Sequence, residues 1–588
     1  MEIRRIFDLL PYYLENYGWK TDAVAGKLNG EWRRYSIQEY VEISNNISYG
    51  FLAKGVKPGD KIAIISTNRP EWNFLDMGIM QIGAIPVPIY PTISESDYQH
   101  ILNHAEICYV IVEGEELLRK IEHILPEISS LKGIYTFINR GRFNFLEELI
   151  QLGKENPLSE KVEEIKETIK SNDIATLIYT SGTTGSPKGV MLSHNNLIQN
   201  AKACSSIPPV GSEGIAMSFL PLCHVYERMM NYLYQYLGIS VYYAENLGTI
   251  GENIKEIKPH ILTTVPRLLE KIYDKIISNG RKLPWIQRQI FFWAVNIGQR
   301  FEFHNKNGWI YNIQLSIADK LVFSKWREAL GGRFEVIVSG GASLQPRLGR
   351  VFTAAGIPIM EGYGLTETSP VIAVSNFTKH GRKFGTVGPV LQGVEVKIAE
   401  DGEILCRGHN VMLGYYKDPE NTAKAIDKEG WFHTGDTGVI EPEGQLRITG
   451  RKKSIFKTSF GKYVNPQLIE EKFKESPFIE NIIVLGENQK FAAALIQPDF
   501  VFLKSYCKLK NIPYSTSQEI IQNDIIRKRI GKEVIKYNKF FGETEKVKKY
   551  EFISDEWSIQ TRELTPTLKL KRNVINAKYK TMIDKLFE

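Results

Sequence analysis

Residues 179–189 combine glycines, hydroxyls and one lysine in the order Tyr-Thr-Ser-Gly-Thr-Thr-Gly-Ser-Pro-Lys-Gly. Apolar runs at 174–178 and 190–192 flank them, so the pattern predicts a strand, a loop and a second strand. The glycines let backbone N–H groups turn inward as an anion-binding nest, the Ser/Thr hydroxyls add donors, and Lys188 supplies a full positive charge. The stretch therefore predicts a loop that holds a triphosphate rather than a solvated turn.

The spacing of this loop excludes a Walker A motif, which needs Gly, four residues, Gly-Lys and then Ser or Thr. Counted from Gly182, the second glycine position is Pro187, and the residue after Lys188 is Gly189. The apolar run that follows also predicts a strand where a Walker A loop needs a helix. A different kind of phosphate loop is indicated.

The elements that position this loop are predicted from the alternation of short apolar runs with amphipathic stretches, which indicates a parallel α/β sheet. Ligands of such sheets lie at the carboxyl ends of the strands. Two glycine turns, 339–342 and 361–368, follow predicted strands, and we expect them to face a nucleotide. The further predicted strands span residues 61–66, 84–89, 108–112, 216–220, 261–265, 334–338 and 357–360.

Beyond residue 385 the pattern shortens into strands joined by glycine turns, which predicts a small β-barrel. Residues 450–454 are charged and poor in apolar residues, which is typical of a linker. We predict an α/β fold with a large N-terminal domain, residues 1–450, made of two packed α/β subdomains and the barrel. A hinge at 451–453 leads to a small mobile α+β domain, residues 454–588.

Length and composition narrow the class of protein. A chain of 588 residues is too long for one core, and 43% apolar with 24% charged residues is ordinary for a globular protein. The five cysteines have no metal-ligand or CxxC spacing, which fits a reducing compartment. The N-terminus has no signal-peptide core, and Pro86, Pro88 and Pro91 interrupt the longest uncharged apolar stretch. We expect a cytoplasmic protein without a membrane-spanning helix.

Charge and aromatic residues raise two further questions about partners. The net charge is +7, and residues 561–588 hold seven Lys/Arg against three Asp/Glu. This excess could favour a nucleotide, a phosphorylated cofactor or the inner face of a membrane, or be only a solvated surface; we expect no nucleic-acid partner. The aromatic-rich residues 285–304 fit a buried helix or the entrance of an apolar tunnel, and we favour the buried helix.

Four ordered motifs make the chain resemble the AMP-forming acyl/aryl adenylating superfamily over essentially its full length. The loop of residues 179–189 is similar to the family's phosphate motif, and residues 363–367 to its adenine and magnesium motif. Residues 431–436 are similar to its ribose motif, and residues 450–453 to its hinge. Within the superfamily the chain resembles long-chain fatty-acid–CoA ligases, in residues 68–72, 221–228, 265–267 and 564–572.

The resemblance implies a two-step reaction that uses ATP, Mg²⁺ and CoA. A fatty-acid carboxylate attacks the α-phosphorus of ATP, which gives acyl-AMP and pyrophosphate, and the CoA thiol then attacks the acyl carbon and releases AMP. The first step brings two anions together, so positioning and positive charge must carry it. By resemblance, Glu367 and the Thr180 hydroxyl would hold Mg²⁺, Tyr363 would stack on adenine, and Asp436, helped by Arg451, would accept the ribose hydroxyls.

Further nucleotide and CoA contacts follow from the same motifs. In the phosphate loop they are Thr180, Ser181, Gly182, Thr183, Thr184, Gly185 and Lys188. At the two glycine turns they are Gly340, Gly341, Ala342, Glu361, Gly362, Tyr363, Gly364 and Thr366, the last also beside the reacting groups. In the hinge and the C-terminal domain they are Lys453, the hinge residue, and Gly461, whose loop would serve the second step.

The family's catalytic lysine lies near the C-terminus, in the pattern Thr, two residues, Gly-Lys, with Arg three residues after the Lys. Thr565, Lys569 and Arg572 keep this spacing, but Leu568 stands in place of the glycine. We favour Lys569 and leave Lys571 as the alternative. His224, which by its surroundings could be a core side chain, is placed by the resemblance beside the acyl carboxylate, as a substrate contact with a role in catalysis.

Several alternatives stay open at this stage. The acceptor could be a carrier-protein thiol in place of CoA, the reaction could stop at acyl-AMP, or the acid could be shorter or aromatic. A nucleotide-binding regulator without turnover is the alternative from another class. A homodimer and a peripheral membrane contact are compatible with the sequence.

Overall fold

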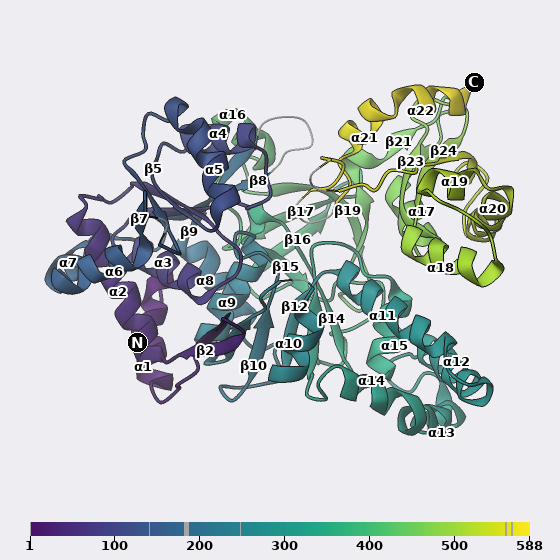
Figure 1. Cartoon of the computed structure of the whole chain (residues 1–588), viewed down its shortest axis with the longest axis horizontal. Helices are drawn as coiled ribbons and strands as arrows, with labels where there is room; N and C mark the ends of the chain where they lie inside the picture. Colours follow the sequence, from purple (N-terminus) through teal and green to yellow (C-terminus); the bar gives the residue numbers. More distant parts are fainter. Residues whose placement is uncertain (1, 140, 181–186, 247, 559–560, 566–568) are drawn as a thin grey trace. The chain divides into compact units, whose positions relative to one another are not determined.

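The computed structural model describes residues 2–139, 141–180, 187–246, 248–558, 561–565 and 569–588 (Figure 1). Contacts divide the chain into two compact units. Unit 1 consists of residues 1–397, 405–434 and 441–446, and unit 2 of residues 398–404, 435–440 and 447–588. The chain thus passes between the two units several times near residues 398–447. The domain boundary at residue 450 stays a prediction.

The largest sheet of unit 1 has eight strands and confirms the predicted parallel α/β arrangement. Its six inner strands, from β14 to β1, are parallel, whereas β15 and β2 are antiparallel at the two edges. Helices connect these parallel strands along the chain, as crossovers require. In sheet order the strands are β15 (Val371–Val374), β14 (Ile359–Gly364), β13 (Val336–Ser339), β12 (Ile261–Thr264), β10 (Ile215–Ser218), β11 (Ser240–Tyr243), β1 (Val24–Leu28) and β2 (Glu31–Tyr35). The connecting helices include α9 (Val225–Leu237), α10 (Ile250–Ile257), α11 (Pro266–Arg281) and α15 (Pro346–Ala354).

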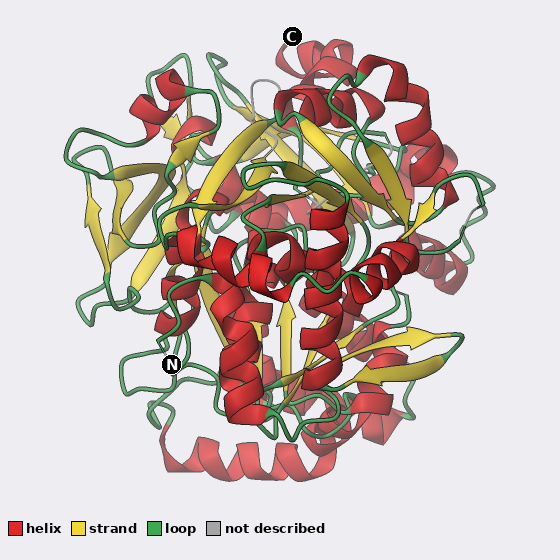
Figure 2. Cartoon of the chain, turned by 90° about the vertical axis from the view of Figure 1, so that its left-hand side faces the viewer, coloured by secondary structure: helices red, strands yellow, loops and turns green. Residues whose placement is uncertain are grey.

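A second sheet of unit 1 is parallel throughout and confirms the second α/β subdomain. Helices pack against these strands (Figure 2), and the residues of α3 (Pro70–Gln81) are almost all buried. The strand order is β4 (Ile85–Pro88), β3 (Lys61–Ile65), β5 (Ile107–Val112), β6 (Gly133–Thr136) and β7 (Asn144–Phe145). The helices around it include α2 (Ile37–Ala53), α4 (Glu95–His104), α5 (Glu115–Ile124), α6 (Leu146–Glu155) and α7 (Ser159–Thr168).

Two smaller sheets complete the region that carries the predicted motifs. One joins β18 (Gly414–Tyr415), β9 (Lys188–Ser193) and β8 (Ile174–Thr180), all antiparallel. The segment predicted as a small barrel forms a four-stranded sheet in the order β16 (Val394–Ile398), β17 (Glu403–Gly408), β19 (Phe432–Ile440) and β20 (Leu446–Arg451).

Unit 2 has its own core and the predicted α+β composition. Strand β24 pairs antiparallel with β23 and parallel with β25. Apolar side chains of these strands pack with those of helices α17, α18 and α20 into one buried cluster. The strands are β23 (Ile479–Leu485), β24 (Ala492–Pro498) and β25 (Val547–Phe552), and the helices are α17 (Pro466–Phe473), α18 (Phe500–Lys510), α19 (Ser517–Gln522), α20 (Asp524–Asn538), α21 (Arg572–Lys578) and α22 (Lys580–Phe587).

Two sequence predictions need correction. Residues 361–364 are not the start of a turn, because β14 continues through Gly364, paired with β15. A side chain at Gly364 would place its Cβ 1.7 Å from the Pro370 carbonyl oxygen, so this pairing requires glycine. The aromatic segment 285–304 forms helix α12 (Trp285–Gln299) as predicted, but Trp285, at the start of that helix, is 67% exposed, so the helix is only partly core.

Candidate functional site

Strands β8 and β9 hold the two ends of the predicted phosphate loop. Thr180 ends β8, Lys188 begins β9, and these two residues face each other across the antiparallel pair. A strand, and not a helix, therefore follows the lysine, as the spacing predicts. Five of the predicted ligands, residues 181–185, lie outside the described residues.

Two histidines of α4 support the base of this hairpin. The Tyr179 hydroxyl lies 2.7 Å from His104 Nδ1, and His100 Nε2 lies 3.0 Å from the Pro187 carbonyl oxygen. The two imidazole rings stack with their centroids 5.4 Å apart. Burial, followed by the charges of His100 and Lys417, lowers the pKa of His104, which favours the neutral ring. Hydrogen bonds therefore hold both sides of the hairpin base, at Tyr179 and at Pro187.

Glu367 is joined to the lysine side of the loop through Tyr415. The Tyr415 hydroxyl donates to Glu367 Oε1 over 3.0 Å, and Lys188 Nζ lies 5.1 Å from the centroid of the Tyr415 ring. Strand β18 places Tyr415 beside β9, while the Met412 N–H donates to the Glu367 carbonyl oxygen over 2.9 Å. Two predicted site residues that are 179 positions apart in the sequence therefore meet at one tyrosine.

This geometry fits Mg²⁺ bound with a nucleotide. Mg²⁺ is usually held by one or two carboxylates, with phosphate oxygens and waters as the remaining ligands. A carboxylate offers about four lone-pair positions, and the Tyr415 hydroxyl takes one at Glu367. Among the residues described here, no cluster of three or more His, Cys, Asp or Glu side chains suits a metal held by protein alone.

The two glycine segments lie at the carboxyl ends of β13 and β14, where a nucleotide was expected. The Gly340 N–H donates to the Thr264 carbonyl oxygen over 3.0 Å, which fixes the first segment. A Cβ at Gly340 would come within 3.2 Å of the Tyr226 ring, and Gly341 has a φ of +79°. Both positions therefore favour glycine. Gly340 is buried against Tyr226, whereas Gly341 is exposed. Gly362 and half-buried Tyr363 lie on the neighbouring strand β14.

His224 caps helix α9. Its Nδ1 accepts the Tyr226 N–H over 3.1 Å, so a neutral ring carries its proton on Nε2. The side chain is half-buried, which distinguishes it from an enclosed core histidine. Asn68 fixes the loop before this cap: its amide nitrogen donates to the Leu220 carbonyl oxygen over 2.6 Å, and its Oδ1 accepts the Leu222 N–H over 3.0 Å.

Behind the cap, α9 carries a buried polar network. Arg228 Nη2 lies 2.5 Å from Asp76 Oδ1, Nη1 donates to Thr176 Oγ1 over 2.7 Å, and the Tyr232 hydroxyl donates to Asp76 Oδ2 over 2.6 Å. These contacts join α9, α3 and β8, the strand that leads into the phosphate loop. Two motifs that are remote in sequence, residues 68–72 and 221–228, thus belong to one structural unit.

In unit 2 the predicted ribose residue Asp436 is buried and paired. Arg451 Nε lies 3.1 Å from Asp436 Oδ1, and the Asp436 side chain is 6% exposed. The adjacent Lys452 pairs with Glu403 over 2.9 Å and with Asp401 over 2.5 Å. Asp436 and Arg451, the predicted ribose pair, are therefore in contact. The ion pairs of Lys452 hold the start of the predicted hinge. The side chain of Lys453 lies outside the described part of the chain.

The two candidate lysines of unit 2 differ in setting. The Thr565 N–H donates to the Lys569 carbonyl oxygen over 2.8 Å, and Lys569 is exposed. Lys571 is half-buried at the start of α21, and its N–H donates to the Glu563 carbonyl oxygen over 2.7 Å. Arg572 anchors the same helix through the Val484 carbonyl oxygen and Glu470. Gly461 has a φ of +76° in the turn between β21 (Phe456–Lys457) and β22 (Tyr463–Val464).

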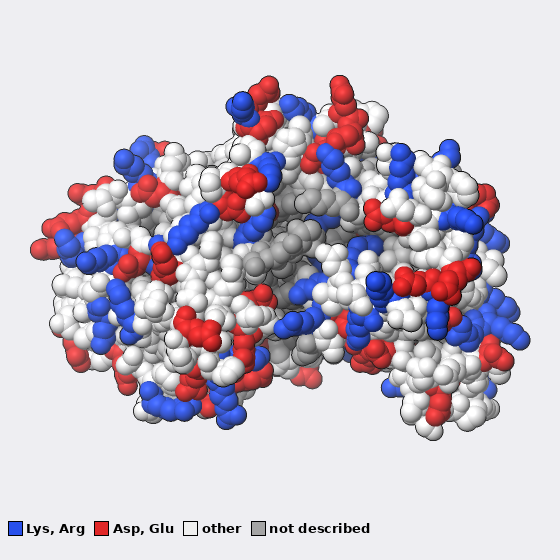
Figure 3. Space-filling view, turned by 90° about the horizontal axis from the view of Figure 1, so that it is seen from above, with Lys and Arg blue, Asp and Glu red and all other residues white. Residues whose placement is uncertain are grey.

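Sequence reasoning missed Tyr415 and the two histidines of α4. None of them stands in a motif that indicates chemistry, and each acts through a contact between distant segments. Positive and negative side chains are interspersed over the face shown in Figure 3, so the coloured residues there form no broad basic strip. No helix within the described ranges is long and apolar enough to cross a bilayer.

Comparison with known proteins gives the family. Residues 15–416 match the AMP-binding enzyme model, and residues 453–588 match the model of the AMP-binding enzyme C-terminal domain. The chain is 31% identical over 570 residues to the long-chain-fatty-acid–CoA ligase FadD15 of Mycobacterium bovis, covering 95% of this chain and 93% of that protein. It is also 31% identical to fatty acyl-CoA synthetase A of Dictyostelium discoideum, covering 96% and 87% of the two chains.

Solved structures share the fold. An anthranilate CoA ligase, AuaEII, in complex with anthranoyl-AMP superposes with a TM-score of 0.72 at 17% identity, over 99% of this chain and 98% of that one. The adenylation domain of a carboxylic acid reductase from Segniliparus rugosus gives 0.75 at 20% identity, over 99% and 94%. Together with the two matched models, these likenesses lead to one conclusion: the chain belongs to the AMP-binding enzyme family.

Proposed function

We propose that this chain is a long-chain-fatty-acid–CoA ligase, which uses ATP to convert a fatty acid into acyl-CoA through acyl-AMP. The observation that carries the proposal is the Glu367–Tyr415–Lys188 arrangement beside the glycine-rich ends of β13 and β14. In this arrangement a carboxylate and an ammonium group both contact Tyr415, and together they would supply a metal ligand and a counter-charge to a nucleotide's phosphates. Relatives of about 30% identity over nearly the whole chain bear the name of this activity.

The chemistry follows from what these groups can hold. Bound Mg²⁺, held by Glu367 and Thr180, would neutralise charge on the phosphate oxygens. Lys188 and the loop donors would retain pyrophosphate, the leaving group, after the carboxylate oxygen bonds to the α-phosphorus. His224 can donate Nε2–H to the substrate carboxylate, because its Nδ1 is occupied by the helix cap. Asp436 and Arg451 would bind the ribose.

The setting of the two lysines supports Lys569 as the group that contacts the carboxylate and the α-phosphate. Lys569 is exposed, whereas Lys571 is half-buried at the start of a helix. We further propose that the C-terminal domain, residues 454–588, rotates at Lys453 between the two steps, and that the Gly461 loop then serves CoA. A homodimer, a cytoplasmic location and a peripheral membrane contact are also proposed.

The test compares Lys569→Ala with Lys571→Ala as its matched control. We expect Lys569→Ala to lower acyl-AMP formation by at least about a hundredfold, the scale for losing one charge-stabilising donor, while CoA attack on supplied acyl-AMP changes little. Lys571→Ala should leave both steps near the parent rate. Equal losses of both steps in Lys569→Ala would contradict the assignment.

The acceptor and the acid are tested with the parent chain. AMP release from ATP, Mg²⁺ and oleate is measured with and without CoA, and then with acids from acetate to oleate. A rate that does not respond to CoA would indicate that the reaction stops at acyl-AMP or uses a carrier thiol. A preference for acetate or an aryl acid would exclude the long-chain assignment.

A further inference from the structure

Helices α12 and α13 (Gly308–Ala318) lie side by side in unit 1 (Figure 1), and both expose large apolar side chains. On α12 the exposed residues are Trp285, Ile286 and Ile290, which are 67%, 65% and 36% exposed. Buried Phe291 and Val295 attach the same helix to the core. Exposed apolar residues are ordinary when scattered, but contiguous ones indicate an interaction site.

The exposed residues of α13 form a stripe along one face. Trp309, Ile310, Ile313 and Ile317 are 48% to 72% exposed, and Leu321 continues the series in the π-helical turn η3 (Asp319–Phe323). Their spacing of three and four residues places them on one side of the helix. The opposite side is also apolar and packs inward, through Tyr311, Ala318 and Val322. A helix that is apolar on both sides is normally buried, so the outward stripe of α13 is unusual.

The charges around this apolar face have one predominant sign. Residues 281–325 contain seven Lys/Arg and two acids, Glu302 and Asp319. Both acids are ion-paired, Glu302 with Arg350 over 2.6 Å and Asp319 with Arg327 over 2.5 Å. The segment that carries the face is therefore net cationic, with exposed Lys306 just before α13 and exposed Lys320 after it.

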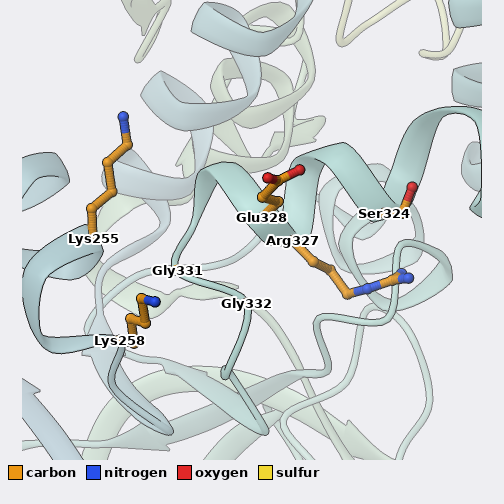
Figure 4. A pocket seen from close by; sticks show the side chains of 7 residues that line it. All are labelled: Lys255, Lys258, Ser324, Arg327, Glu328, Gly331 and Gly332. Carbon is orange, nitrogen blue, oxygen red and sulfur yellow. The ribbon is translucent and has the colours of Figure 1, made fainter.

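A pocket whose charged lining residues are Lys255, Lys258, Arg327 and Glu328, three cations and one acid, includes a residue shortly after the stripe in the sequence. It has a volume of about 450 Å³ and lies between α10 and α14 (Ser324–Ala329). Ser324, three residues after exposed Leu321, lines it on the α14 side, and Lys255 and Lys258 line the other side (Figure 4). Basic pockets beside apolar surfaces suit anionic lipid headgroups.

We propose that the α12–α13 face docks this enzyme on the surface of a membrane that contains anionic phospholipids. Trp285 and Trp309 each begin one of the two helices, and tryptophan is favoured at the boundary between headgroups and acyl chains. The net cationic segment complements anionic headgroups. A second copy on the same face would bring two net cationic segments together, which disfavours a symmetric dimer there. The apolar side chains would enter the outer part of one leaflet without spanning it.

The test measures flotation of the full-length chain with vesicles of phosphatidylcholine, with and without phosphatidylglycerol, in the absence of ATP and fatty acid. We expect the bound fraction to rise about tenfold or more with the anionic lipid, because each cation near the surface adds attraction. The double variant Ile313→Gln, Ile317→Gln should reduce binding by about tenfold, since it removes buried apolar area. The double variant Lys306→Glu, Lys320→Glu should abolish the preference for phosphatidylglycerol.

The control replaces two apolar residues of α18 that are more exposed, Val501→Gln and Leu509→Gln, at 80% and 76% in the parent against 53% and 48% for Ile313 and Ile317. This control should bind vesicles like the parent. Failure of the parent to bind either vesicle would overturn the proposal, as would equal loss in the control. Light scattering that shows a dimer in the parent and a monomer in the Ile313/Ile317 variant would assign the face to a second copy instead. Flotation measures binding without turnover, so its result does not depend on the ligase activity.

Discussion

Helices α9 and α13 both depart from the usual pattern of buried apolar and exposed polar side chains, but in opposite ways. Helix α9 buries Glu227, Arg228 and Asn231 completely, whereas α13 exposes Trp309 and Ile313. The buried groups of α9 find their partners within the chain, in Asp76, Thr176 and Thr263. For the exposed groups of α13 we infer a partner outside the chain. The buried polar residues of α9 thus support the candidate site, whereas the exposed apolar residues of α13 mark the proposed docking surface.

The energetic consequences of the two reversals differ. A buried charge is costly unless it is paired, so a change in α9 should affect the stability of the whole fold. An exposed apolar side chain costs little in the isolated protein, so a change in α13 should affect association only. Mutations in the two helices can therefore test whether α9 affects stability and α13 affects association.

The largest effect is expected from Arg228→Met, which leaves the Asp76 carboxylate buried without its cation. We expect the free energy of unfolding to fall by about 3–5 kcal/mol, measured by urea denaturation. The double variant Arg228→Met, Asp76→Leu should recover much of this loss, because the orphaned charge is removed. A loss below about 1 kcal/mol in the single variant would mean that the α9 network behaves like a surface pair.

The next effect is a pH dependence at Glu227. Burial raises the pKa of this carboxyl to about 7 from 4.5, although hydrogen bonds from Ser218 and Thr263 oppose the rise. Between those values the folded chain holds more protons on this group than the unfolded chain, so stability falls as pH increases and the loss is complete above about pH 7. The loss is on the order of 3 kcal/mol at most.

Glu227→Gln removes this titration, so its melting temperature should decline less than that of the parent between pH 5 and pH 8, roughly the window given by the shifted pKa. Thermal denaturation across that range is the measurement. Glu420→Gln, at a carboxylate that is 79% exposed, is the control and should keep the parent slope. Parallel slopes for the parent and Glu227→Gln would show that Glu227 is ionised in the folded chain.

The smallest effect on stability is expected from Ile313→Gln. The change lies on a surface already exposed to water, so the free energy of unfolding should shift by no more than about 0.5 kcal/mol, as urea denaturation can show. A loss of 2 kcal/mol or more, the scale of a core truncation, would mean that Ile313 is buried in the native protein, and the contrast with α9 would then disappear.

Local sequence patterns predicted much of the fold of this chain. The β8–loop–β9 unit, the glycines at the ends of β13 and β14, and the parallel sheet depend on backbone preferences and on alternation of apolar residues, which adjacent residues specify. The family followed from the order of its motifs. The exposure of α12 could not be read, because an aromatic helix has the same sequence pattern whether a neighbour covers it or not.

The sequence by itself determined which residue types are available for phosphate, metal and ribose, because each type stands in a short motif whose spacing fixes its local geometry. Only the tertiary structure decided that Tyr415 joins Glu367 to Lys188, that Arg228 pairs with Asp76, and that α13 turns apolar residues outward. These are contacts, or missing contacts, between segments far apart along the chain. Their energies depend on packing and burial, which no local pattern records.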